Sequence, residues 1–255
     1  MIDKAMIERN FSRYARSYDK YAIIQEKCAY DLISKVRDED YYSVLEVGCG
    51  TGNFTKLLRE YFPSASLRAV DISAKMIEVA KEKLGNFNID FIVDDAESLS
   101  VGRDFNLITS NVSIQWFGNL ESTLSFYKHI LSQDATVLVS VYGPGTFCEL
   151  RESLKKMLGD EVILSSSYFY NGTLLKDIFS IYFPRLEIDY KMYSQEFESL
   201  LDLLRSIKYT GTSGIGVSGA GDWTKGKIEQ LEEVYKSIYG KIVATSEVFF
   251  VKARR

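Results

Sequence analysis

Three glycines stand at alternate positions in the segment VLEVGCGTGNF, which spans residues 44–54. Glycine has no side chain, so Gly48, Gly50 and Gly52 predict a loop whose backbone N–H groups can approach a small ligand closely. A phosphate-binding loop needs Lys followed by Ser or Thr after its last glycine, but Asn53 and a phenylalanine stand there. A dinucleotide-binding loop needs its third glycine where Asn53 is. Both of these ligand classes are therefore disfavoured.

Acidic side chains accompany this loop. Asp71 ends a predicted strand, where its carboxylate could accept both hydroxyls of a ribose in charge-assisted hydrogen bonds. With Glu46 before the glycines, the run EVGCGTG resembles the S-adenosylmethionine loop of class I methyltransferases. That resemblance implies that Glu46 orients the methionine ammonium group and that Asp95, beside Ala96, binds the adenine amino group. Each acid alone is also a common cap or turn residue, and Cys49 is interpreted as a small loop filler and not a nucleophile.

The composition excludes several other functions. The chain has 255 residues, a net charge of −4, one histidine (His129) and three widely spaced cysteines. A single histidine excludes a His pair, and an odd number of cysteines argues against a disulfide framework or a zinc site. The acidic balance argues against a general nucleic-acid binder, and no apolar run approaches the roughly 20 residues that span a bilayer. We expect a cytoplasmic protein without metal, nucleic acid or membrane association.

Short apolar strands alternate with helices through the middle of the chain. The predicted strands are 43–48, 66–71, 89–95, 105–111 and 135–143, and the predicted helices are 54–62, 73–84 and 119–131. This rhythm predicts a doubly wound, Rossmann-like α/β sheet, mostly parallel, with helices on both faces. Ligands of such sheets bind beyond the carboxyl ends of the strands, where the strand order reverses. The glycine loop follows the first of these strands.

The two ends of the chain differ from this alternating middle. Helices are predicted at 5–20, 22–37, 147–158, 196–209 and 227–240, with strands at 186–194 and 241–253. We expect a single domain, 1–255, whose closing strand is antiparallel. It divides into an N-terminal helical cap (1–40), a cofactor-binding core (41–143), a helical lid or substrate region (144–185) and the C-terminal part of the sheet (186–255).

Five further segments look like the malonyl-acyl carrier protein O-methyltransferases of bacterial biotin synthesis. They are NFSRYARSYDKYAIIQ (10–25), SNVSIQWFGNL (110–120), YGPGTFCEL (142–150), LRSIKYTG (204–211) and TSEVFFVKARR (245–255). The resemblance runs nearly end to end, and NxxxQW followed by GTFxEL is far more specific than the glycine loop. The chain departs from the family at Ser246, where an aromatic residue is common, and at Asp94, where a glycine is common.

The resemblance implies methylation of the free carboxylate of malonyl-acyl carrier protein, giving the ester that primes pimeloyl synthesis. A malonyl carboxylate is ionised at neutral pH, so this displacement needs alignment and exclusion of water but no general base. By resemblance, Tyr18, Gln115 and Trp116 position the reacting groups. The residues expected to bind S-adenosylmethionine are Tyr14, Tyr18, Gln25, Glu46, Gly48, Cys49, Gly50, Gly52, Asp71, Ile72, Asp95, Ala96 and Asn111.

Acyl carrier protein is strongly acidic, so this acidic chain needs a local basic patch to bind it. Basic residues recur along the first predicted helix and again after GTF, although such residues more often belong to a solvated helix face. The residues expected to contact substrate or carrier protein, with the enzyme as a monomer, are Arg13, Arg16, Phe147, Arg151, Lys155 and Lys208.

Two other functions share the cofactor residues. One is a methyltransferase acting on a small phenolic or quinone substrate. The other is a methyltransferase-like protein that binds the cofactor without turnover. A nicotinamide dehydrogenase is a more distant alternative, which Asn53 opposes.

Overall fold

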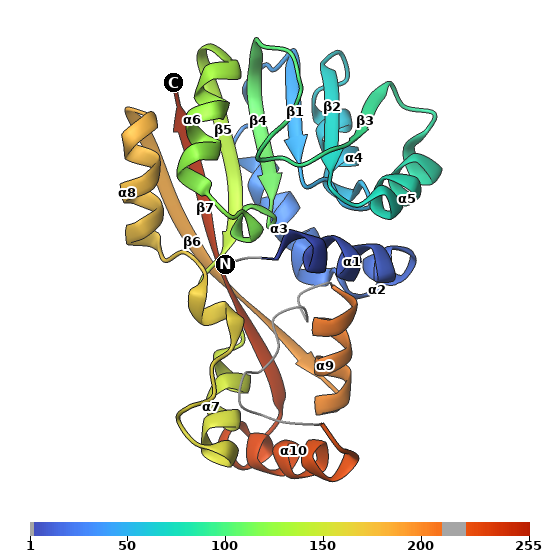
Figure 1. The fold of residues 1–255 in the computed structure, drawn as a ribbon, viewed down its shortest axis with the longest axis vertical. Coiled ribbons are helices and arrows are strands. Elements are labelled where there is room, and N and C mark those ends of the chain that lie inside the picture. The colour runs from blue at the N-terminus through green and yellow to red at the C-terminus, as the bar shows by residue number, and fades with distance from the viewer. Residues whose placement is uncertain (1–2, 211–222) are drawn as a thin grey trace.

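The computed structural model describes residues 3–210 and 223–255, and its strands form one twisted sheet (Figure 1). Seven strands lie in the order β3-β2-β1-β4-β5-β7-β6 within this part of the chain. Strands β1 to β5 pair in parallel, and β7 is antiparallel to both of its neighbours, as predicted. The bounds are β1 Ser43–Val47, β2 Ser66–Asp71, β3 Ile89–Val93, β4 Phe105–Asn111, β5 Leu131–Tyr142, β6 Arg185–Phe197 and β7 Ile242–Arg254.

Helices cover both faces of the sheet. One face carries α3 (Ile23–Ser34), α4 (Asn53–Tyr61) and α5 (Ala74–Leu84), and the other carries α6 (Leu120–Ile130) and α8 (Gly172–Tyr182). Adjacent residues of the central strands point to opposite faces and are fully buried. Val44 and Leu107 join the core with α3 and α4, whereas Leu45 and Ile108 join the core with α6 and α8. The apolar residues of these two strands therefore divide between two cores, one on each face of the sheet.

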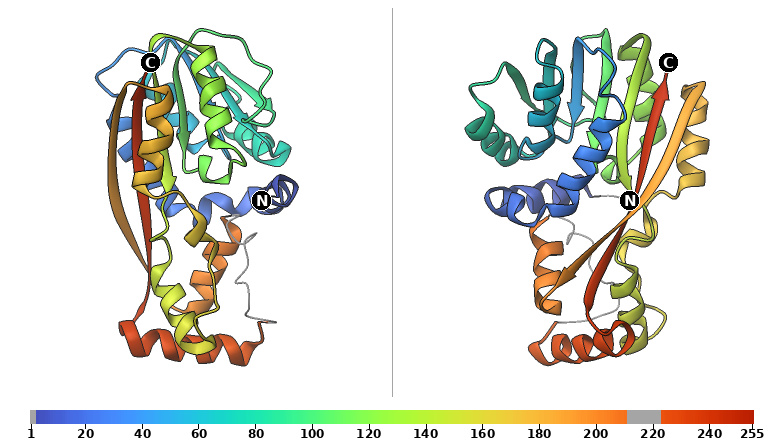
Figure 2. Two further views of the ribbon diagram at one scale, coloured as in Figure 1. Left: turned by 60° about the vertical axis from the view of Figure 1, so that its left-hand side comes forward. Right: turned by 180° about the vertical axis from the view of Figure 1, so that it is seen from behind.

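Strands β6 and β7 are each 13 residues long and pair along their whole length. Their far ends extend beyond the other strands and carry a second group of helices (Figures 1 and 2). These helices are α7 (Cys148–Leu158), α9 (Leu200–Tyr209) and α10 (Lys225–Tyr239). They enclose a core of their own, which includes Leu154, Leu203, Leu231 and Tyr235. We call this part the lower lobe.

The N-terminal cap lies across the carboxyl ends of the parallel strands (Figure 1). The prediction of one helix over 5–20 is wrong, because α1 (Lys4–Tyr14) is followed by a 3₁₀ turn, η1 (Ala15–Ser17), and then by α2 (Tyr18–Tyr21). Tyr14 has φ −111° and ψ 9°, which interrupts the helix. The basic residues of this segment therefore do not form one continuous stripe. Arg16 instead pairs with Glu78 and Glu82 of α5.

Smaller differences concern element ends. The predicted helix 22–37 ends at Ser34, and the predicted helix 196–209 begins only at Leu200, because β6 continues to Phe197. Ser73 caps α5 by accepting a hydrogen bond from the backbone N–H of Met76. None of the helices in the described ranges is long and apolar enough to cross a membrane.

Candidate functional site

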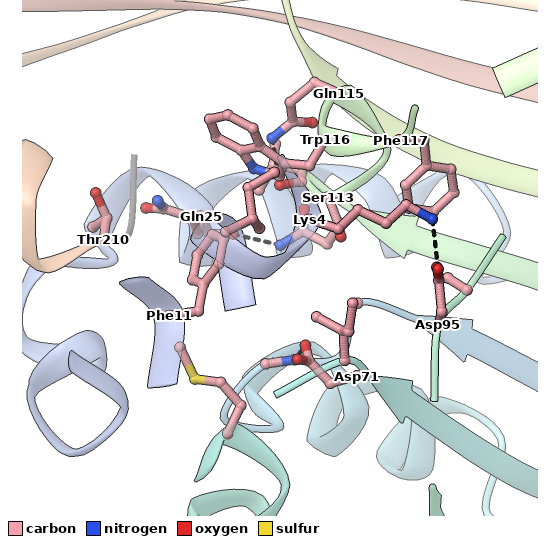
Figure 3. A pocket seen from close by; sticks show the side chains of 18 of the residues that line it. Lys4, Phe11, Gln25, Asp71, Asp95, Ser113, Gln115, Trp116, Phe117 and Thr210 are labelled. Atoms are coloured by element: carbon pink, nitrogen blue, oxygen red, sulfur yellow. Dashed lines mark hydrogen bonds and ion pairs between the residues drawn. The ribbon is translucent and has the colours of Figure 1, made fainter. Parts of the chain in front are cut away.

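A cavity of about 100 Å³ lies between the carboxyl ends of β1, β2, β3 and β4 and the helix α1 (Figure 3). We call it the first cavity. The loops after the four strands contribute one wall, and the N-terminal cap contributes the other. Figure 3 shows Gln115 and Trp116 on the opposite side of this space from Asp71. The predicted site residues that line it are Tyr18, Gln25, Gly48, Gly50, Asp71, Ile72, Asp95, Ala96, Asn111, Gln115 and Trp116.

The three loop glycines have positive φ angles of 69°, 56° and 83°, which L-residues with a side chain rarely adopt. A Cβ atom at Gly48 would lie 2.0 Å from Ser113 Oγ, and one at Gly52 would lie 2.9 Å from Leu84 Cδ1. A Cβ atom at Gly50 would meet nothing within 4 Å. Close packing therefore requires the outer two glycines, and Gly50 leaves open space beside the cavity. Gly52 does not line the first cavity but precedes α4 as its N-cap.

Asp71 is anchored by the loop that it faces. One carboxylate oxygen accepts from the Gly50 backbone N–H at 2.9 Å, and the other accepts from the Ser73 N–H at 2.8 Å. Burial raises the pKa of Asp71 to about 6 despite these two bonds. A carboxylate has about four acceptor positions. The anchored group can therefore still accept two ribose hydroxyls.

The first cavity is acidic. The charged residues that line it, in the described part of the chain, are the carboxylates Asp71, Asp95 and Glu97 and the ammonium of Lys4. Lys4 reaches from α1 and forms ion pairs with both Asp95 and Glu97. The net negative lining opposes a phosphate or a pyrophosphate and favours a cation. S-adenosylmethionine, which carries a sulfonium and an ammonium group, fits this lining.

Glu46 does not reach the first cavity. Its side chain is 1% exposed, and its Oε2 has no hydrogen-bond partner among the described residues. Burial raises its pKa to about 8, so it is mostly protonated at neutral pH. Cys49 is also buried away from this cavity, and burial raises the pKa of its thiol well above the usual range. The structure therefore gives neither residue a direct contact with a ligand in this cavity.

Aromatic and polar groups form the side of the cavity opposite Asp71. The Trp116 ring lies edge-on to Phe11 of α1 and to Phe169, with centroids 6.4 Å and 5.5 Å away. Gln115 donates to the Val112 carbonyl at 2.7 Å, and its buried Oε1 has no partner in the described residues. Tyr18 lies within the influence of Asp71: burial, and after it the charge of Asp71, raises the pKa of Tyr18, so its hydroxyl stays protonated. These groups could orient a polar substrate within an apolar wall.

The structure does not bring Tyr14 to the first cavity. After the helix interruption, the Tyr14 ring packs edge-on against Tyr209 of α9, with centroids 4.9 Å apart, and Tyr21 stacks on Tyr209 at 4.7 Å. The Arg13 guanidinium lies 5.7 Å from the Tyr14 ring, and the Lys20 ammonium lies 5.5 Å from the Tyr21 ring. This aromatic cluster joins the cap to the lower lobe.

A larger cavity of about 610 Å³ lies in the lower lobe, lined mainly by α7, α9 and the segment 164–169, and it reaches the end of β5 at Tyr142. We call it the second cavity. Two of the residues that the sequence predicted to contact substrate or carrier protein, Phe147 and Lys208, line this cavity. Arg151 and Lys155 do not, and Arg151 donates to the Pro144 carbonyl at 2.9 Å. Gln25, Tyr142 and Thr210 line both cavities.

Several lining residues were not expected from the sequence. Tyr142 ends β5 at the same edge as the glycine loop, so the rule that ligands bind at the carboxyl ends of strands could have identified it. Thr210 and Lys4 gave no such signal, because each reaches the cavity from a helical segment far from the loop in sequence.

Comparisons with known proteins agree with this architecture. Residues 44–134 match the family model described as a methyltransferase domain. Malonyl-[acyl-carrier protein] O-methyltransferase 2 of Ilyobacter polytropus is 33% identical over 94% of this chain and 92% of that protein. The malonyl-[acyl-carrier protein] O-methyltransferase of Acetivibrio thermocellus is 32% identical over 100% of this chain and 95% of that protein.

Solved structures share the fold at low sequence identity. The YcgJ protein of Bacillus subtilis superposes with a TM-score of 0.61 at 16% identity, covering 89% of this chain and 97% of that one. A Haemonchus contortus phosphoethanolamine N-methyltransferase 2, solved with S-adenosylhomocysteine, superposes with a TM-score of 0.56 at 18% identity, covering 88% of this chain and 52% of that one.

Proposed function

Because the chain belongs to the malonyl-[acyl-carrier protein] O-methyltransferase family, we propose that it methylates the free carboxylate of malonyl-acyl carrier protein. The methyl donor is S-adenosylmethionine, and the product is the methyl ester that primes pimeloyl synthesis for biotin. We also propose that the protein is a monomer and that it works in the cytoplasm. End-to-end similarity to the curated relatives carries the proposed methylation, and the acidic first cavity supports the choice of donor.

Residues of the first cavity would hold S-adenosylmethionine, which supplies an electrophilic methyl group on a sulfonium sulfur. Asp71 would accept the ribose hydroxyls, Asp95 would accept from the adenine amino group, and the open side of Gly50 would admit the ligand close to the backbone. At about 100 Å³ the first cavity is smaller than the roughly 300 Å³ of typical ligand pockets. The cap residues Lys4 and Phe11 would therefore have to move as the donor enters.

The protein has little proton chemistry to perform. The malonyl carboxylate is ionised at neutral pH, so it would need no base to attack the methyl carbon of the bound donor, and S-adenosylhomocysteine would leave as the C–O bond forms and the C–S bond breaks. Burial raises the pKa of Tyr18 and of Tyr142, so both hydroxyls stay protonated and can donate hydrogen bonds that align the carboxylate. Trp116, on the side of the cavity opposite Asp71, would help to exclude water from the same space.

The direct test is methyl transfer itself. Purified protein is incubated with labelled S-adenosylmethionine and malonyl-acyl carrier protein, and the carrier protein is weighed by mass spectrometry. We expect the gain of one methyl group, removable by esterase. Methylation of a quinone or phenol but not of the malonyl thioester would contradict the proposal, and so would donor binding without transfer to any of these acceptors.

A further inference from the structure

We propose that the second cavity binds the 4′-phosphopantetheine arm that carries the malonyl group, with Arg205 and Lys208 binding its phosphate. This inference rests on the proposed function, since a carrier protein presents its acyl group on such an arm. The arm is a flexible chain with methylene groups, a gem-dimethyl group, two amides and a phosphodiester. A site for it must be long, mostly apolar and positively charged near its entrance.

The two cavities lie next to each other, as this reaction needs. Gln25, Tyr142 and Thr210 border both spaces. A thioester lying in the second cavity could therefore extend its terminal carboxylate toward the first cavity, where the donor binds. The volume of about 610 Å³ is within the range of roughly 300–1,000 Å³ usual for ligand sites.

The walls of the second cavity suit the apolar parts of the arm. Leu150 and Leu154 of α7, Leu204 of α9 and Phe169 form much of its surface. Ser166 also lines it, is only 5% exposed, and has a buried Oγ without a hydrogen-bond partner in the described residues. A buried polar group without a partner costs free energy. An amide of the arm could supply the missing hydrogen bond.

The charge of the second cavity suits a phosphate. Arg205 and Lys208, both on α9, are its charged residues, and no carboxylate belongs to its lining within the described ranges. Lys208 is exposed and has no ion pair there, whereas Arg205 pairs at 3.2 Å with Asp202. Lys208 is therefore available to an incoming phosphodiester, and Arg205 can exchange its weak, solvent-exposed pair with Asp202 for the same group.

Lys208 has a second conceivable role, which is to bind the malonyl carboxylate itself. The two roles differ in the substrate that they affect. Malonyl-acyl carrier protein has both the carboxylate and the phosphodiester, whereas the malonyl thioester of N-acetylcysteamine has the carboxylate without the phosphodiester. A phosphate contact affects only the first substrate, and a carboxylate contact affects both.

The experiment compares Lys208→Ala, Arg205→Ala and the double variant with wild type on these two substrates. We expect the ratio of kcat/KM for malonyl-acyl carrier protein to kcat/KM for the short thioester to fall about tenfold for each single variant, mainly through KM. Lys176→Ala, an exposed lysine on α8 away from both cavities, is the matched control and should leave the ratio unchanged. Thermal unfolding verifies that each variant is folded.

A binding measurement tests the cavity independently of turnover. Calorimetry with free 4′-phosphopantetheine and no methyl donor should show binding to wild type that weakens in Lys208→Ala and in Leu204→Trp, which fills the cavity. If Lys208→Ala and Arg205→Ala leave the ratio of the two kcat/KM values unchanged, whether or not both values fall, the inference is overturned. If wild type methylates neither thioester, the proposed function fails, and calorimetry alone decides: binding that Leu204→Trp abolishes supports the cavity assignment, and no binding overturns it.

Discussion

The two cavities share a wall but have opposite charge. In the described residues, the first cavity is lined by three carboxylates and one ammonium, whereas the second is lined by a guanidinium and an ammonium without a carboxylate. Such a pair suits a cationic donor on one side and an anionic acceptor arm on the other. The shared residues Gln25, Tyr142 and Thr210 mark where the two reactants would meet.

The cavities also differ in how the chain builds them. Loops that directly follow β1 to β4 form most of the first cavity, and their backbone positions are set by the sheet. The second cavity depends on α7 and α9, which the lower ends of β6 and β7 hold in place. Variants that damage one cavity should therefore leave ligand binding at the other largely intact.

Asp71→Asn should have the largest effect and should be confined to the first cavity. The amide cannot accept hydrogen bonds at both of its ends, so it loses one backbone anchor and the charge that binds the ribose. We expect the affinity for S-adenosylmethionine to fall about 100-fold, from two charge-assisted bonds of roughly 1.5 kcal/mol each. Calorimetry with the donor and with 4′-phosphopantetheine measures both sites. A comparable loss at the second site would refute the independence of the two cavities.

Glu46→Gln tests whether Glu46 is uncharged in the folded protein. If it is uncharged, only the residues that line the first cavity contribute its charge. The pKa of Glu46 is about 8 in the folded protein, and its ordinary value is 4.5. Between these values the folded protein holds one more proton than the unfolded chain, so its stability falls as pH rises, by about 1.4 kcal/mol per pH unit. The variant lacks this loss. We expect chemical denaturation from pH 5 to pH 9 to show that the free energy of unfolding of the variant increases relative to that of wild type up to about pH 8. Parallel plots of this free energy against pH for the two proteins would contradict a buried neutral Glu46.

Arg13→Gln should have the smallest effect and concerns the surface beside the second cavity. Arg13 lies over Tyr14, which packs on Tyr209 next to Lys208, and it has no ion pair among the described residues. We expect KM for malonyl-acyl carrier protein to rise about threefold at low salt and to approach wild type at high salt. Arg16→Gln is the matched comparison, because that guanidinium is paired with Glu78 and Glu82 and should change KM less. A larger increase in KM for Arg16→Gln than for Arg13→Gln would contradict this prediction and would place the carrier-protein docking surface near α5 instead.

The sequence predicted the sheet and the first cavity better than the ends of the chain. The segments 43–48 and 105–111 become buried strands because their apolar residues pack against helices on both faces of the sheet, and the ligand position follows from the common direction of the strands. The expected helix 5–20 failed because tertiary contacts compete with local periodicity. At the interruption, the Tyr14 ring packs on Tyr209 of α9. Two residues later, Arg16 pairs with Glu82 of α5.

What the sequence determined by itself is local: a glycine loop whose backbone a ligand can approach, an acid at the end of the next strand, and a set of motifs shared with one family. What only the tertiary structure decided is which distant residues share a space. Lys4 meets Asp95, Glu46 is buried beneath the loop that it precedes, and α7 and α9 enclose the second cavity. Periodicity and spacing specify which face of an element is buried. They do not specify which partner it is buried against, because that depends on the packing of the whole chain.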